Sequence, residues 1–199
     1  MIYMTMHFQK SDPVILGSGE LYILEYDKIT DPANLTENEE EQLINIGAIE
    51  RGCTITVGTE TKDIKSGNRG VVAKWIVDKE VKLTTGVMTW IMKNVAQYLL
   101  GANYEETKDG EKVTQSKMVI SKNDNAKPVY LRFVHNKRTG GQLIVNIYRA
   151  IFDSDLQFTF DDDNPTSINY EFLALSDGVN NNYVEFIETF EEDEEEIGG

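Results

Sequence analysis

A change of hydrophobic period inside residues 71–101 constrains the fold more than any other feature of this sequence. Between Val71 and Leu83 apolar and polar residues alternate, which is typical of a strand with one buried and one solvated face. From Thr84 the apolar residues recur at helical spacing, and Gly101 offers a left-handed stop. The expected apolar positions are Val71, Ala73, Trp75, Val77, Val81 and Leu83 on the strand, and Val87, Met88, Ile91, Met92, Val95, Tyr98 and Leu99 on the helix. The sequence therefore predicts a strand that leads into one amphipathic helix, at about residues 84–100.

The rest of the chain predicts strands. Short runs rich in β-branched and aromatic residues occur at 21–26, 54–57, 118–120, 129–134, 143–148, 156–160, 170–174 and 184–186. One other short helix is expected, from the capping-box spacing of Thr36 and Glu39 to about Asn45. These elements predict a single domain over residues 1–190 that is mainly β with one main α-helix, a β-sandwich or open barrel with long hairpins whose apolar face the helix covers.

Two hairpins provide candidate contact surfaces. In the first, strands near residues 54–57 and 71–83 flank a long polar loop whose charged tip contains Lys62, Asp63, Lys65, Asn68 and Arg69. In the second, strands 129–134 and 143–148 flank a basic turn, and its candidate contact residues are Arg132, Lys137 and Arg138. The basic turn is interpreted as one half of a protein–protein contact with an acidic neighbour.

The net charge of the chain lies in its last quarter. The sequence has 34 acidic and 19 basic residues, and 15 of the acidic residues follow Ala150, whereas no Lys or Arg follows Arg149. Such a field repels phosphates, so a domain that grips DNA or RNA is not expected. Residues 191–199, with six consecutive acidic residues, are predicted to form a disordered acidic tail.

Signals for catalysis, cofactors and metals are weak. His7 and His135 lack the spacing of a zinc site, and no nucleophile elbow or P-loop is present. We therefore expect no enzyme activity, no cofactor and no metal site. Two alternatives remain: a monomeric acidic β-sandwich binding module that captures Ca²⁺ or a basic protein through Asp161–Asp163 and the tail, and, less favoured, a hydrolase that uses His135. No stretch approaches the length of a membrane span, so no membrane association is expected.

The order of these segments resembles the tail tube (major tail) proteins of tailed bacteriophages and related phage-like particles. The segments that carry the resemblance cover most of the chain: residues 14–22 (VILGSGELY), 46–52 (IGAIERG), 94–101 (NVAQYLLG), 143–150 (LIVNIYRA) and 170–175 (YEFLAL). The family is characterised by this layout more than by invariant residues.

The resemblance implies a structural virion protein, assembled in the host cytoplasm and located in the virion tail. Its subunits would form hexameric rings that stack into a tube around a tape-measure protein, with tail terminator and distal tail or baseplate proteins at the ends. Double-stranded DNA would pass through the bore without specific binding during ejection. The tip of the first hairpin would then reach the neighbouring ring, and the polar side chains of the following strand, Lys74, Asp78, Glu80 and Lys82, would face the lumen. Contractile and non-contractile tails share this layout.

Overall fold

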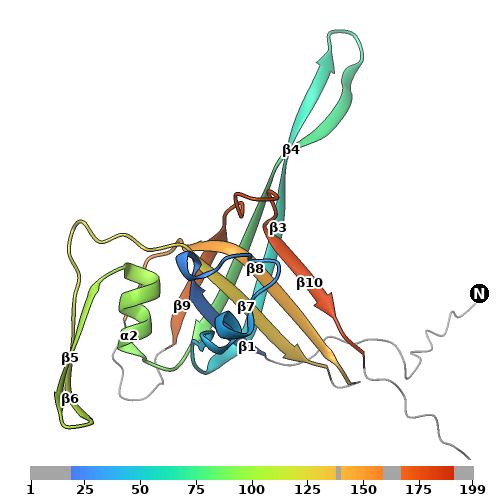
Figure 1. Cartoon of the computed structure of the whole chain (residues 1–199). Helices are drawn as coiled ribbons and strands as arrows, with labels where there is room; N and C mark the ends of the chain where they lie inside the picture. The colour runs from blue at the N-terminus through green and yellow to red at the C-terminus, as the bar shows by residue number, and fades with distance from the viewer. Residues whose placement is uncertain (1–18, 138–139, 159–166, 191–199) are drawn as a thin grey trace, which may run out of the picture.

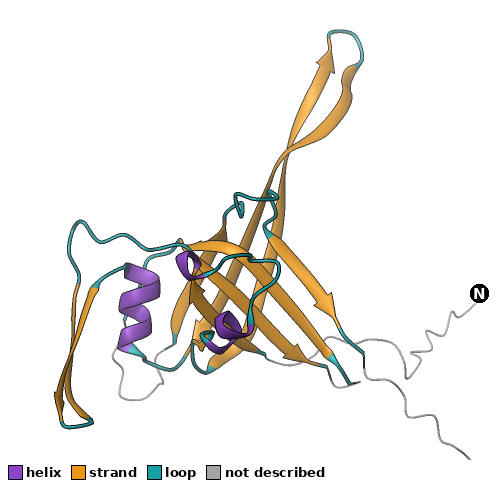
Figure 2. Cartoon of the chain, viewed as in Figure 1, coloured by secondary structure: helices purple, strands orange, loops and turns teal. Residues whose placement is uncertain are grey.

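The computed structural model describes residues 19–137, 140–158 and 167–190 (Figure 1). Within these ranges the chain is mainly β with one main helix, and its antiparallel sheets do not close into a barrel (Figure 2). The β-sandwich-like fold class expected from the sequence is therefore confirmed. Four parts of the sequence that carry predictions lie outside the described residues: residues 1–18, Arg138, Asp161–Asp163 and the tail 191–199.

Eight strands form the main sheet. They are β1 (Glu20–Glu25), β2 (Ile44–Asn45), β3 (Ile49–Ser66), β4 (Gly70–Val87), β7 (Val129–Asn136), β8 (Gln142–Phe152), β9 (Ile168–Ala174) and β10 (Val184–Glu188). Their order is β2-β1-β7-β8-β9-β4-β3, and β10 pairs with β8 beside β9. A separate two-stranded sheet consists of β5 (Asn103–Asp109) and β6 (Lys112–Val119). The short helical turns η1 (Tyr26–Lys28) and α1 (Glu37–Glu41) lie between β1 and β2.

One apolar core joins the two halves of the main sheet. Leu21 of β1, Leu131 of β7, Leu83 of β4 and Phe172 of β9 are all fully buried and belong to the same cluster. Because β1 and β4 are not neighbours in the sheet, the sheet must curve so that its two halves face each other. Each such side chain contributes about 1.5–3 kcal/mol to folding through its removal from water.

The helix is shorter than the sequence predicts. It consists of α2 (Met92–Asn94) followed directly by the π-helical turn η2 (Val95–Leu100) and ends at Gly101, which has the expected left-handed φ of 61°. The predicted start at residue 84 is wrong, since residues up to Val87 continue β4 and pair with β9. Val87 is fully buried at the end of β4, and an apolar residue at this position fits the strand alternation as well as the helical stripe. The helical stripe is confirmed only from Val95 onward.

Four smaller expectations need correction. Residues 156–158 do not form the predicted strand. Residues 62–66, which were expected to form a loop, belong to β3. Residues 103–115, for which no strand is predicted, form most of the β5–β6 hairpin, in which Asp109 pairs with Lys112. The capping box of Thr36 and Glu39 is confirmed, but its helix ends at Glu41 because Ile44 and Asn45 pair with β1. The other predicted strands that lie within the described residues are found.

Candidate functional site: the β3–β4 arm

Residues 58–80 form a two-stranded arm that extends away from the body of the protein (Figure 1). β4 pairs with β9 only from Lys82 to Val87, so beyond this point β3 and β4 pair only with each other. The strands are joined by a short turn at residues 67–69, where the Ser66 hydroxyl donates a hydrogen bond of 2.8 Å to Asn68 Oδ1. The arm is thus a long ladder with no second layer on either side.

The arm exposes an unusual amount of apolar surface. The side chains of Trp75 and Ile76 are 53% and 55% exposed, and Val71, Val72 and Val77 are about half exposed. These five residues lie within seven positions of the sequence. Soluble monomers rarely expose so many large apolar side chains close together unless they belong to a contact site.

Two register shifts decide which side of the arm each residue occupies. The pairing moves from Glu60↔Asp78 to Thr61↔Ile76, and again from Ile64↔Ala73 to Lys65↔Val71. Val77 and Val72 are therefore left without a ladder partner, as in β-bulges. Because an extra residue reverses the alternation of its strand relative to the partner, the odd–even pattern of β4 is reversed between Val77 and Val72 and is restored at Val71.

The shifts place apolar side chains on both sides of the arm. Directly paired residues share a side, and the core-facing side is marked by Ile55↔Leu83 and Val57↔Val81. Along uninterrupted β3, this side continues through Thr61 and therefore includes Ile76. Trp75, opposite Lys62, lies on the other side. The prediction that Trp75 shares a buried face with Leu83 is therefore wrong in both burial and side.

The candidate lumen residues do not share one side. Lys74 lies opposite Asp63, at 3.8 Å between Nζ and Oδ1, on the side that includes Ile76. Asp78, Glu80 and Lys82 lie between the first register shift and the body of the protein, on the opposite side of the ladder. Lys82 Nζ contacts Glu80 at 3.4 Å and Glu171 of β9 at 3.5 Å. These carboxylates, Glu80 above all, raise the pKa of Lys82.

The candidate tip residues are split between strand and turn. Lys62, Asp63 and Lys65 belong to β3, whereas Asn68 and Arg69 form the turn. Four basic residues and one acidic residue occur between Lys62 and Lys74, in a chain of net charge −15. The end of the arm is therefore locally basic.

The candidate basic turn already has partners within the chain. Arg132 pairs with Glu40 of α1 and donates hydrogen bonds to Asn146 Oδ1 at 3.0 Å and to the Tyr130 hydroxyl at 3.1 Å. Lys137 is buried, and its Nζ lies 3.0 Å from Glu188 and 3.9 Å from the centre of the Phe190 ring. The acidic neighbour inferred from the sequence is thus supplied in part by the same chain.

Among the described residues there is no assembled site for the alternative chemistries, and Asp161–Asp163 and the tail, on which the Ca²⁺ alternative depends, lie outside these residues. Within residues 19–137, 140–158 and 167–190 no three His, Cys, Asp or Glu side chains group as metal ligands. His135 is buried within β7. Burial raises the pKa of the Cys53 thiol to about 12, which disfavours the reactive thiolate. None of the helices in the described ranges has the length and apolar character needed to cross a membrane.

Comparison with known proteins adds no assignment, because neither a family model nor a curated protein matches this sequence.

Sequence reasoning missed Val72 and Ile76 as parts of this surface. It placed β4's apolar residues at odd positions on one face, and these two occupy even positions. Two large apolar residues at positions expected to be polar indicated that both sides of this segment are partly apolar.

Proposed function

We propose that this protein is a structural subunit that assembles into hexameric rings, which stack into a bacteriophage tail tube. The observation that carries the proposal is the β3–β4 arm with apolar side chains on both of its sides. The layout that resembles tail tube proteins supplies the identity of the assembly. The arm supplies the physical reason for assembly.

A second copy of the chain provides what the arm lacks. Two-stranded ribbons are marginally stable in water when they have no layer to pack against. Packing Trp75, Ile76 and Val71 against another subunit removes their exposed area from water, at about 25 cal/mol per Å² of apolar surface. Self-association therefore stabilises both the arm and the ring stack.

Charge favours the same partner. The basic end of the arm, with Lys62, Lys65, Arg69 and Lys74 against Asp63, faces a second copy whose overall charge is −15. Opposite charges orient the encounter and select one docking geometry. The contact is expected to weaken with salt at its charged rim, whereas its apolar centre persists.

The other partners follow from the assembly of a tail tube. A tape-measure protein occupies the bore during assembly in the host cytoplasm, and tail terminator and distal tail or baseplate proteins cap the tube ends. Double-stranded DNA passes without specific binding, since subunits with a net charge of −15 repel phosphates. No catalytic residue, cofactor or membrane contact is part of this function.

Electron microscopy of the negatively stained protein tests the proposal. We expect rings or hollow tubes at high protein concentration, examined at low and high salt. Trp75→Ser combined with Ile76→Ser should give small separate particles with an unchanged circular dichroism spectrum. Val113→Ser is the matched control, since Val113 is 42% exposed on β6, outside the arm. A wild-type protein that stays monomeric at every concentration and salt level would overturn the proposal, and saturable Ca²⁺ binding by that monomer would favour the binding module.

A further inference from the structure

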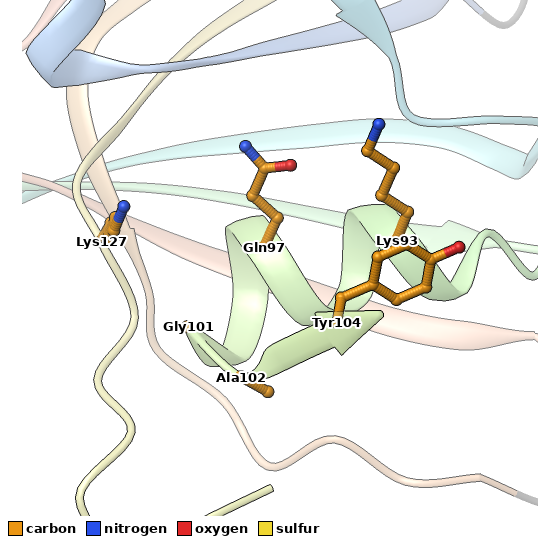
Figure 3. Close-up of a pocket in the computed structure, with 6 residues that line it drawn as sticks. All are labelled: Lys93, Gln97, Gly101, Ala102, Tyr104 and Lys127. Atoms are coloured by element: carbon orange, nitrogen blue, oxygen red, sulfur yellow. The ribbon is translucent and has the colours of Figure 1, made fainter. Parts of the chain in front are cut away.

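A basic pocket lies at the C-terminal end of the helix, far from the arm. It has a volume of about 330 Å³ and is lined by Lys93, Gln97, Gly101, Ala102, Tyr104 and Lys127 (Figure 3). Lys93 and Gln97 project from the same side of the helix, and Lys127 comes from the segment that precedes β7. Three separate parts of the chain therefore contribute to one concave surface.

Gly101 holds the pocket together. Its φ of 61° ends the helix, and a Cβ placed on it would lie 2.0 Å from the carbonyl oxygen of Asn125. Only glycine permits both this conformation and this close approach. The contact fixes the segment that carries Lys127 against the end of the helix that carries Lys93.

The two lysines have no ion-pair partner within 4.0 Å among the described residues, although each has a carboxylate in its vicinity. The charge of Lys127 acts on Glu25, whose side chain pairs with Lys28 at 3.6 Å and accepts a hydrogen bond from Gln97. Burial opposes ionisation of Glu25, but Gln97, Lys28 and Lys127 together lower its pKa. Glu25 is thus an ionised carboxylate already engaged by other groups.

On the other side of the pocket, the charge of Lys93 acts on Glu106. The Glu106 carboxylate accepts a 2.8 Å hydrogen bond from the Tyr104 hydroxyl and pairs with Lys108 at 3.5 Å. Among the six residues that line the pocket, Lys93 and Lys127 are the charged ones, so the lining itself carries a charge of +2 in an acidic protein. Both pocket lysines are exposed and free to bind an added anion.

We propose that this pocket binds the acidic C-terminal segment, residues 191–196, of a second copy of the chain. This is the only run of six consecutive acidic residues in the sequence, and no Lys or Arg follows Arg149 to neutralise it. The partner is a second copy because residues 188 and 189, which precede the chain's own acidic segment, lie on the side of the body opposite the pocket. Residues 188 and 189 are tied to the β7–β8 turn through Lys137 and Gln142, on the side of the body away from α2 (Figure 1).

The inference rests on the proposed self-assembly but involves a different surface from the arm. A single exposed ion pair contributes only about 0.2–1 kcal/mol, so one tail in one pocket binds weakly. In a ring or stack many tails and pockets are held close together, and avidity multiplies the weak contacts. The contact also neutralises part of the charge that would otherwise oppose assembly.

Fluorescence anisotropy with a labelled peptide of residues 190–199 tests the inference. The host is the full-length chain with Glu191, Glu192, Glu194 and Glu195 replaced by Gln, so that its own tail does not compete. We expect saturable binding that weakens with salt, and at least a tenfold loss with K93E/K127E. The control K112E/K117E makes the same charge change at exposed lysines of β6 and should retain the affinity.

Two results would overturn the inference: no saturable binding, or equal losses in both double variants. Binding of inorganic phosphate at the pocket without binding of the peptide would also overturn it and assign a small-anion site instead. The outcome is separable from that of the proposed function. Rings without peptide binding reject only the tail contact, whereas peptide binding by a chain that never forms rings rejects only the tube.

Discussion

The two halves of β4 have similar composition and opposite environments. Leu83 and Val87, in the half paired with β9, are fully buried, and the adjacent Val81 is 2% exposed, whereas Val71, Trp75 and Val77, in the half that belongs to the arm, are about half exposed. Both halves form an antiparallel ladder with β3, and only the half from Lys82 to Val87 also pairs with β9 along its other edge. The difference is the second layer, which the curved sheet and helix provide for one half only. Alternation of apolar residues thus indicates a strand, whereas their burial requires a second layer of structure packed against the apolar face.

The largest expected effect tests the buried half. Leu83→Ala removes a fully buried side chain from the centre of the core and leaves a cavity. We expect a loss of about 2–5 kcal/mol in the free energy of unfolding, measured by urea denaturation. A loss below about 1 kcal/mol would show that the sheet halves do not pack as described.

The next effect tests the helix that completes this layer. Gly101→Ala introduces a Cβ at a positive φ and against the Asn125 carbonyl, so we expect a loss of at least about 1 kcal/mol. Gly67→Ala is the matched control, since a Cβ there meets nothing within 4 Å and its φ is not in the left-handed region. Equal melting temperatures for the two variants would contradict the tight approach of residue 125.

A smaller effect concerns the capping box at the edge of the body. Thr36→Ala should cost about 1 kcal/mol, because the hydroxyl caps α1. Hydrogen bonds from the Thr36 and Thr30 backbone N–H groups lower the pKa of Glu39 to about 2. Its folded pKa lies below the ordinary value of 4.5, so its stabilising contribution is present above pH 4.5 and is lost as pH falls towards 2.

Amide hydrogen exchange can follow this titration. Protection of the Thr30 and Thr36 amides should decrease as pH falls from 4.5 to 2, after correction for intrinsic exchange rates. Glu39→Gln should show reduced protection already at pH 6 and little further change with pH. A wild-type chain whose corrected protection is the same at pH 5 and pH 2.5 would contradict the assignment.

The smallest effect on stability is expected in the arm. Trp75→Ser should change the free energy of unfolding of the isolated subunit by about 0.5 kcal/mol or less, because the side chain is already half exposed. The same change should strongly reduce self-association, measured by sedimentation velocity. If Trp75→Ser destabilised the isolated subunit as much as Leu83→Ala does, Trp75 would be packed against other residues of the same chain. The contrast between the two halves of β4 would then be wrong.

Much of the fold could be predicted from local sequence. Alternation located β1, β7, β8, β9 and β10, the Thr36–Glu39 spacing located α1, and Gly101 located the end of the helix. The start of the helix was missed because Val87 fits both a strand and a helical stripe. The β5–β6 hairpin was missed as an element because its residues are almost all polar and exposed.

The candidate sites were less predictable. The tip of the arm was located correctly in the sequence, but the two register shifts were not visible in the alternation of β4. They depend on pairing with β3, which is a property of two strands together. The basic pocket was missed for a similar reason, since Lys93 and Lys127 are 34 positions apart and meet only because the residues before β7 pack against Gly101.

The sequence by itself determined the local conformations and the charge distribution, because hydrophobic period, capping residues and acidic runs act over a few neighbouring positions. The tertiary structure alone decided which apolar residues are buried, which side of the arm each residue occupies and which lysines share a pocket. These properties depend on contacts between distant segments, and the same local pattern is compatible with a filled core in one half of β4 and an exposed docking surface in the other.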